Sequence, residues 1–145
     1  RSRRSNLCGE KRTIGCGKRC ENIRRVGRRV GRISSAAWWQ RRHDATEFVV
    51  QRYKGTRPAC AENWGSHRLR FPSHQYQERT VLHELIHATV SAPHAGHGRL
   101  YCARYLEIVG WWWNDDVKDR MREGYRENNV KWHPHNEKQT KKRYL

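Results

Sequence analysis

Residues 81–98, VLHELIHATVSAPHAGHG, concentrate side chains that bind metal ions and move protons: four histidines and one glutamate. His83 and His87 are four positions apart, so on a helix their imidazoles lie one turn apart on the same face. Two imidazoles placed in this way can share one zinc ion at about 2.0–2.1 Å each. The spacing therefore predicts half of a zinc site.

Glu84 adds a proton acceptor to this pair of ligands. On a helix its side chain is rotated by about 100° from His83, so it points past the metal instead of onto it. A carboxylate there can take a proton from a water molecule that zinc has made more acidic. HELIH thus predicts two zinc ligands and the catalytic base of a hydrolase. The alternative is a histidine-rich helix whose imidazoles pair locally.

The third ligand has to come from beyond the helix, and His94 and His97 are the candidates. The metzincin pattern is excluded, because Val90 stands where that pattern needs glycine and Pro93 where it needs the third histidine. Four histidines together would instead make a closed, structural zinc site. Tyr101 could place a hydroxyl near a tetrahedral intermediate, as a transition-state stabiliser, or serve only in packing.

The HELIH motif needs a helix, and the sequence from about Gln75 onward supplies one. Leu82, Leu85, Ile86 and Thr89 recur at helical spacing and predict a buried stripe. A second helix follows over residues 99–109 and is expected to end at Gly110. A third, polar helix is expected after Asn114 or Asp115 as its N-cap, and the stretch from residue 128 is a polar, basic tail.

Strand-forming residues precede the HELIH helix. Residues 48–53 and 59–63 flank the turn KGTRP, and residues 67–71 alternate polar with apolar before Pro72. These segments predict a small antiparallel sheet. The expected fold class is therefore α+β, with the sheet packed on the HELIH helix and further helices around it.

Positive charge gathers before the sheet. Residues 1–42 hold 14 Lys/Arg against 2 Asp/Glu, a net of +12, out of +17 for the chain. Residues 21–33 predict an amphipathic helix with Ile23, Val26, Val30 and Ile33 on one face and Arg24, Arg25, Arg28, Arg29 and Arg32 around the rest. Such a helix faces nucleic acid or a membrane surface, or is simply docked with a wet side. We expect nucleic acid as the partner of this arm, against a solvated arm that aids solubility.

Cysteines and tryptophans leave alternatives open. No C-x-x-C pair occurs among five cysteines, which favours a reducing compartment over a disulfide framework. Cys8, Cys16 and Cys20 are better explained as free thiols than as metal ligands. At least one of Trp111, Trp112 and Trp113 is expected to be partly exposed, where it could contact a partner, while the others pack in the core. Trp38 and Trp39 have the same two alternatives, core packing or contact with a partner. No apolar run is long enough to cross a bilayer.

HELIH followed by HGRLY, residues 97–101, resembles the SprT-like zinc metallopeptidases, in the small bacterial and phage-type members. The resemblance runs from about Trp38 to Val109. It implies that His97 is the third zinc ligand and that His94 is a loop residue or an additional ligand. Arg99 and Leu100 stand where the family more often has Pro and Glu. No cysteine follows Cys102 in this sequence, so the zinc ribbon common in the family is not expected here.

The same resemblance implies a minigluzincin-like core with an edge strand that receives an extended peptide. Together with the charge distribution it predicts three parts: a basic arm with the amphipathic helix (1–37), a metallopeptidase domain (38–127) and a basic tail (128–145). It also implies the cytoplasm of a bacterial cell, with a phage gene or a virion association as further options, and DNA-associated proteins as substrates. The expected function is thus zinc-dependent peptide hydrolysis. The alternative is a basic nucleic-acid-binding or virion-associated protein with a structural zinc.

Overall fold

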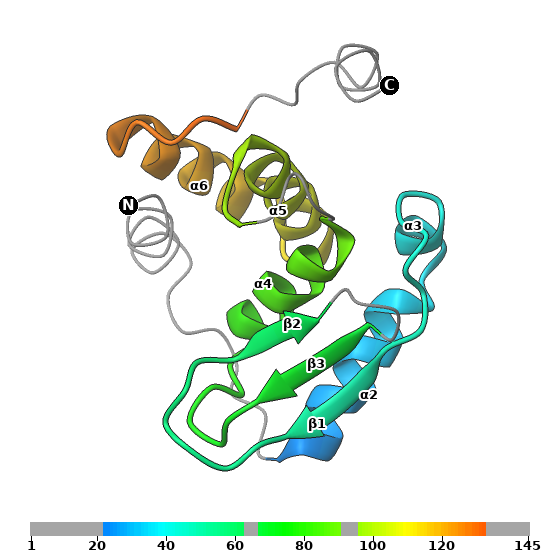
Figure 1. The fold of residues 1–145 in the computed structure, drawn as a ribbon. Helices are drawn as coiled ribbons and strands as arrows, with labels where there is room; N and C mark the ends of the chain where they lie inside the picture. The colour runs from blue at the N-terminus through cyan, green and yellow to red at the C-terminus, as the bar shows by residue number, and fades with distance from the viewer. Residues whose placement is uncertain (1–21, 63–66, 91–95, 133–145) are drawn as a thin grey trace, which may run out of the picture. The chain divides into compact units, whose positions relative to one another are not determined.

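The computed structural model describes residues 22–62, 67–90 and 96–132. It is an α+β protein, as expected, and five helices and a three-stranded sheet lie in those ranges (Figure 1). The chain divides into two compact units. One spans Cys16–Ser91 and the other combines Arg1–Gly15 with Ala92–Leu145. The division expected at residues 37 and 127 stays a prediction.

Helix α2 (Ile23–Ser34) forms where the apolar spacing predicted it. Asn22 caps its N-terminus, and the side-chain oxygen of Asn22 accepts a hydrogen bond from the Arg25 backbone N–H at 3.1 Å. Val26, Val30 and Ile33 are at most 2 % exposed. This face packs against strand β1 (Val49–Arg52) and helix α4 (Glu78–Thr89), and α2 runs behind the sheet in Figure 1.

The short helix α3 (Ala37–Gln40) follows α2 and resolves part of the tryptophan question. Trp39 is fully buried, and its indole N–H donates to the Ala45 carbonyl at 2.6 Å. Trp38 is half-buried, and the guanidinium of Arg42 lies 4.3 Å from the centre of its ring. Core packing thus accounts for Trp39, while Trp38 lies at the rim.

The sheet contains β1 (Val49–Arg52), β2 (Cys60–Glu62) and β3 (Arg68–Phe71) in the order β1-β3-β2. The prediction of an antiparallel sheet was wrong in part, because β1 and β3 are parallel while β2 and β3 are antiparallel. The last strand inserts between the first two. Its alternation buries Leu69 and Phe71 completely, which suits a central strand, whereas β1 is mostly exposed.

The HELIH segment lies on helix α4 (Glu78–Thr89), which packs on β2 and begins slightly later than expected. Its buried stripe includes Val81, Leu82, Leu85 and Ile86, all fully buried.

In the other unit, helix α5 (Arg99–Trp112) packs on α6 (Asp115–Glu127). Asn114 caps α6, as predicted, by accepting from the Val117 N–H at 2.9 Å. The expected end of α5 at Gly110 was wrong, because Gly110 lies inside the helix. A Cβ there would come within 2.8 Å of the Lys118 side chain, so glycine serves close packing of α5 on α6. Trp111, Trp112 and Trp113 are all half-buried, so partial exposure is confirmed.

Candidate metal centre

Helix α4 brings His83 and His87 together. Their Nε2 atoms are 3.2 Å apart and the ring centres 4.8 Å apart, in an edge-to-face arrangement. His83 is 8 % exposed and His87 is half-buried. Two nitrogens bound tetrahedrally at about 2.05 Å from one zinc ion would be about 3.3 Å apart. The spacing of this pair therefore fits two ligands of one ion with little adjustment.

His97 is held by its own neighbours in the residues that lead into α5. Gly96 has φ of 97°, a left-handed conformation that favours glycine and turns the chain just before His97. The Cys102 thiol donates to the His97 carbonyl at 3.6 Å, and the Tyr101 ring lies edge-to-face with the imidazole at 4.8 Å. Tyr101 in turn stacks on Tyr105, and both are fully buried. The orientation of His97 is therefore fixed by packing.

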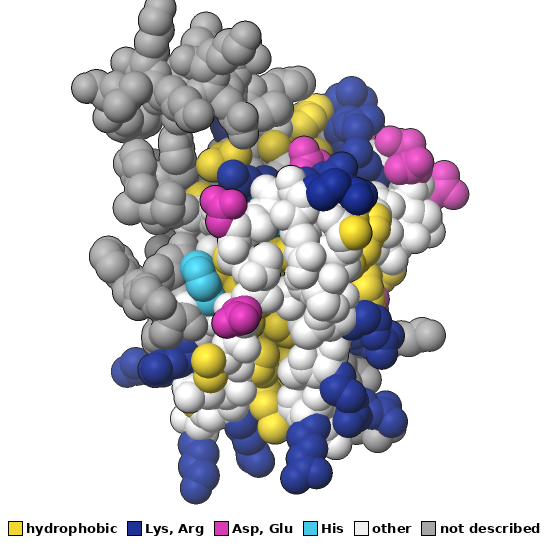
Figure 2. Space-filling view, turned by 90° about the vertical axis from the view of Figure 1, so that its right-hand side faces the viewer, with side chains coloured by type: hydrophobic (Ala, Val, Ile, Leu, Met, Phe, Trp, Pro, Cys, Tyr) yellow, Lys and Arg dark blue, Asp and Glu magenta, His cyan; other side chains and the backbone are white. Residues whose placement is uncertain are grey.

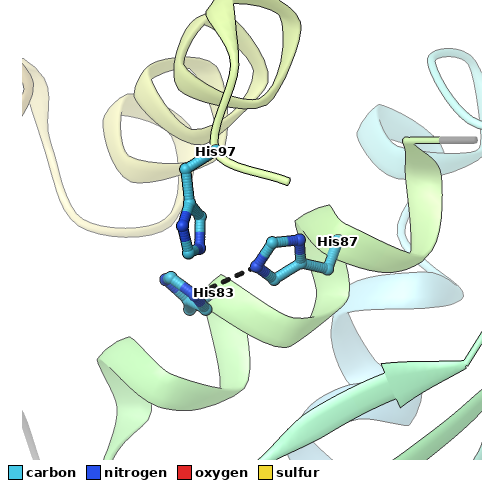
Figure 3. A group of neighbouring side chains, drawn as sticks. All are labelled: His83, His87 and His97. Atoms are coloured by element: carbon cyan, nitrogen blue, oxygen red, sulfur yellow. Dashed lines mark hydrogen bonds between the residues drawn. The ribbon is translucent and has the colours of Figure 1, made fainter. Parts of the chain in front are cut away.

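The three histidines form a group that could hold a metal ion. Their candidate ligand atoms all lie within 4.8 Å of one another (Figure 3). Figure 3 draws the three side chains, and a dashed line joins His83 to His87. Three neutral imidazoles suit zinc, copper, iron or nickel better than calcium or magnesium. His94, the other candidate ligand, lies outside the described residues.

Glu84 is buried on α4, with 5 % of its surface exposed. It lies between the two histidines in sequence, so its side chain leaves the helix in a different direction from both ligands. Burial of a carboxylate is costly unless it is compensated, and such groups concentrate at functional sites.

Tyr53 interacts electrostatically with Glu84, which no sequence motif indicated. Its hydroxyl donates to the carbonyls of Arg57, at 2.6 Å, and Pro58. The pKa of Tyr53 is raised, first by burial and then by the negative charges of Cys60 and Glu84, while Arg57 and Arg70 oppose the shift. The phenol therefore lies within electrostatic range of the Glu84 carboxylate and stays protonated to a higher pH. Only the fold of β1 and its following loop brings it there.

The arginines predicted to meet nucleic acid divide into two groups. Arg24, Arg25, Arg28 and Arg32 are exposed on α2. Arg29 instead turns inward, where its guanidinium lies 3.2 Å from the Glu78 carboxylate in the first turn of α4. The side chains of this ion pair are 20 % and 8 % exposed. Arg29 therefore connects two helices.

Comparison with known proteins adds no relative to this picture. No family model, no curated protein and no solved structure matches the chain. Within the described residues, no helix is long and apolar enough to cross a membrane.

Proposed function

We propose that His83, His87 and His97 bind one zinc ion and that the site hydrolyses peptide bonds. The observation that carries this proposal is the convergence of the three imidazoles beside a buried glutamate on the same helix as two of them. Three protein ligands leave a fourth zinc position for water or substrate, as catalytic sites require. The resemblance of HELIH and HGRLY to SprT-like metallopeptidases supports the same assignment.

Zinc held by these three histidines would supply a Lewis acid and would make a bound water more acidic. Glu84 accepts a proton from the water that attacks the peptide carbonyl carbon. The protonated Glu84 then gives this proton to the leaving amide nitrogen as the C–N bond breaks, and the carboxylate is restored. Burial of Glu84 keeps bulk water from competing for that proton.

The edge strand β2 is the proposed place where an extended substrate aligns. It lies at one end of the strand order and packs on α4, so a peptide added along it would pass the histidine-bearing helix (Figure 1). Main-chain hydrogen bonds to an edge strand tolerate many sequences, because side chains do not make them. We therefore expect broad cleavage of unfolded or extended segments.

The test combines zinc stoichiometry with cleavage of an unfolded protein substrate. We expect one zinc per chain and cleavage by the parent protein. Glu84→Gln should keep the zinc and lose at least about 100-fold of the activity, which is the usual contribution of a general base. Glu107→Gln, the same change at an exposed position of α5, is the matched control and should cleave like the parent.

Two results would overturn this function. Cleavage by Glu84→Gln at the parental rate would remove the assigned base. A cobalt-substituted protein with four protein ligands and no exchangeable water, together with no cleavage by the parent, would instead establish a structural zinc. That outcome would favour the alternative of a nucleic-acid-binding protein whose metal only holds the fold.

A further inference from the structure

Three arginines form a strip on the exposed face of α2. Arg24, Arg28 and Arg32 follow one another at intervals of four residues, and all three are exposed. Residues at this spacing lie on one side of a helix. We call these three residues the α2 strip. In Figure 2, the charged side chains visible along the lower edge are all lysines and arginines.

Nothing on the described part of the chain neutralises the α2 strip. Helix α2 contains no acidic residue, and the ion pairs of the described residues include none of Arg24, Arg28 and Arg32. Arg29 is the exception on this helix, because Glu78 compensates it at 3.2 Å. The strip therefore presents three cations to solvent without a partner among the described residues.

The three arginines of the strip destabilise helix α2. Like charges four residues apart repel, each pair costing about 0.2–0.5 kcal/mol in an isolated helix. Arg24 also lies in the first turn, where the helix dipole disfavours a cation and where no acid is present. A helix that served only to cover the core could carry neutral or mixed charges here at no loss of packing. The strip thus fits an anionic partner from outside the fold.

Helix α6 provides a contrast within the same chain. There Arg122 pairs with Asp119 at 3.3 Å and Arg126 pairs with Glu123 at 3.2 Å. Residues 96–132 carry 7 Lys/Arg against 6 Asp/Glu, whereas residues 22–90 carry 13 against 5. Within the described residues, the excess positive charge is therefore concentrated in the part that holds α2.

The buried face of α2 bears on which anionic partner the strip fits, a lipid membrane or a row of phosphates. An amphipathic helix binds a membrane by inserting its apolar face into the lipid. In α2 that face consists of Ile23, which is half-buried, and of Val26, Val30 and Ile33, which are at most 2 % exposed because they pack within the fold. No apolar face remains for lipid. Electrostatic contact with a row of phosphates needs only the arginines.

We propose that the α2 strip is a docking surface for the phosphodiester backbone of nucleic acid. Arg24 and Arg32 are eight positions apart, so the strip spans about 12 Å of helix. One strand of duplex DNA presents a phosphate about every 3.4 Å of axis, so the strip faces three to four phosphates. Backbone contacts of this kind bind without reading sequence. The inference stands whether or not the histidine site hydrolyses peptides.

The test measures how binding to a short fluorescent DNA duplex depends on salt, using the full chain. Each phosphate contact contributes about −0.9 to the slope of log K against log salt, so replacing Arg24, Arg28 and Arg32 together with Gln should reduce the slope by about 2.7. From about 50 to 200 mM salt, the parent should lose about 40-fold more affinity than this variant. Glutamine keeps the helix propensity, and circular dichroism checks the fold.

The matched control replaces Arg120, Arg122 and Arg126 of α6 with Gln, which makes the same change of net charge on a helix. We expect its slope to change by less than about 1. Lysine at the three α2 positions should keep the parental slope, because the charge is retained. Equal slope changes in the two glutamine triples, or no DNA binding by the parent, would overturn the proposal. So would tighter, arginine-dependent binding to vesicles of phosphatidylcholine and phosphatidylserine than to DNA.

Discussion

Tyr101 packs against His97, the proposed third zinc ligand. Its ring contacts the His97 imidazole edge-to-face at 4.8 Å and stacks on Tyr105 at 5.7 Å, and it is fully buried. The sequence left open whether its hydroxyl stabilises a transition state. Its ring contacts indicate a positioning residue, because they hold the imidazole in one orientation. The role of the hydroxyl stays a prediction.

Replacing Tyr101 should therefore lower the zinc affinity only where the new side chain lacks an aromatic ring. Tyr101→Phe keeps the aromatic contact, and we expect its zinc affinity to stay within about threefold of the parent. Tyr101→Leu keeps an apolar side chain but loses the ring edge, and residues that orient ligands typically contribute about 10–100-fold to affinity. Competition titration with a chromophoric chelator measures both variants. Equal losses in both would assign the effect to the hydroxyl instead.

The candidate site could be predicted only in part from the sequence. His83, Glu84 and His87 follow from one helical turn, because the spacing alone fixes their relative directions. The choice of His97 over His94 came from resemblance, since local spacing leaves loop histidines equivalent. Tyr53 was missed altogether, because its place near Glu84 depends on how β1 and the loop after it pack, which no local pattern encodes.

The ion pair between Arg29 and Glu78 connects α2 to the first turn of the histidine-bearing helix. Removing Arg29 would take a cation away from the Glu78 carboxylate, whose side chain is 8 % exposed. Breaking fully buried pairs costs about 3–5 kcal/mol, and the 20 % exposure of Arg29 reduces this to about 2 kcal/mol of unfolding free energy for Arg29→Met. Urea denaturation gives this value directly.

A double variant isolates the pair from its surroundings. Arg29→Met with Glu78→Gln removes both charges, so we expect it to recover about half of the stability lost in Arg29→Met. Arg24→Met is the matched control on the same helix, since Arg24 is exposed, and it should change the free energy of unfolding by less than about 0.5 kcal/mol. A loss in the control as large as in Arg29→Met would assign the effect to the helix rather than to the pair.

At the scale of elements, helices were predicted better than their connections. Apolar spacing located α2, and Asn114 marked the start of α6, because both signals are local. The predicted strand direction was wrong for β1 and β3, because their pairing depends on a later strand that inserts between two earlier ones. The prediction that α5 ends at Gly110 was wrong for a related reason. Its lack of a side chain serves contact with Lys118 of α6 and not the end of α5.

The N-cap of α6 gives a stability prediction at the same scale. The Asn114 side chain accepts from the Val117 N–H at 2.9 Å, so Asn114→Ala should lower the free energy of unfolding by about 1 kcal/mol. Asn114→Asp keeps the acceptor and adds a favourable charge at the helix N-terminus, so it should be at least as stable as the parent. Thermal unfolding compares them. Equal stability of Asn114→Ala and the parent would show that this cap contributes nothing.

At the scale of the whole molecule, the exposed arginines of the α2 strip and the residues of the candidate metal site are different sets of residues. The three histidines and Glu84 are buried or half-buried, whereas the α2 strip is exposed and has no ion-pair partner among the described residues. The proposed nucleic-acid site and the proposed metal site therefore use different residues. We expect the α2 glutamine triple to keep the zinc affinity of the parent, which the same chelator titration measures. A parallel loss of zinc and DNA binding would show that the variant had disturbed the fold.

Zinc bound by the folded chain should also raise its thermal stability, because a ligand that prefers the folded state stabilises it by mass action. At free zinc about 100 times Kd the gain is about 2.7 kcal/mol, and at about 2–4 °C per kcal/mol for a chain of this size Tm should rise by about 5–11 °C. His97→Ala removes one of three ligands and should abolish most of the shift at the same zinc concentration. Magnesium, which prefers oxygen ligands, is the control and should leave Tm unchanged. An undiminished shift in His97→Ala would mean that His97 is not a zinc ligand, and its assignment would then fall even if His83 and His87 still held the ion.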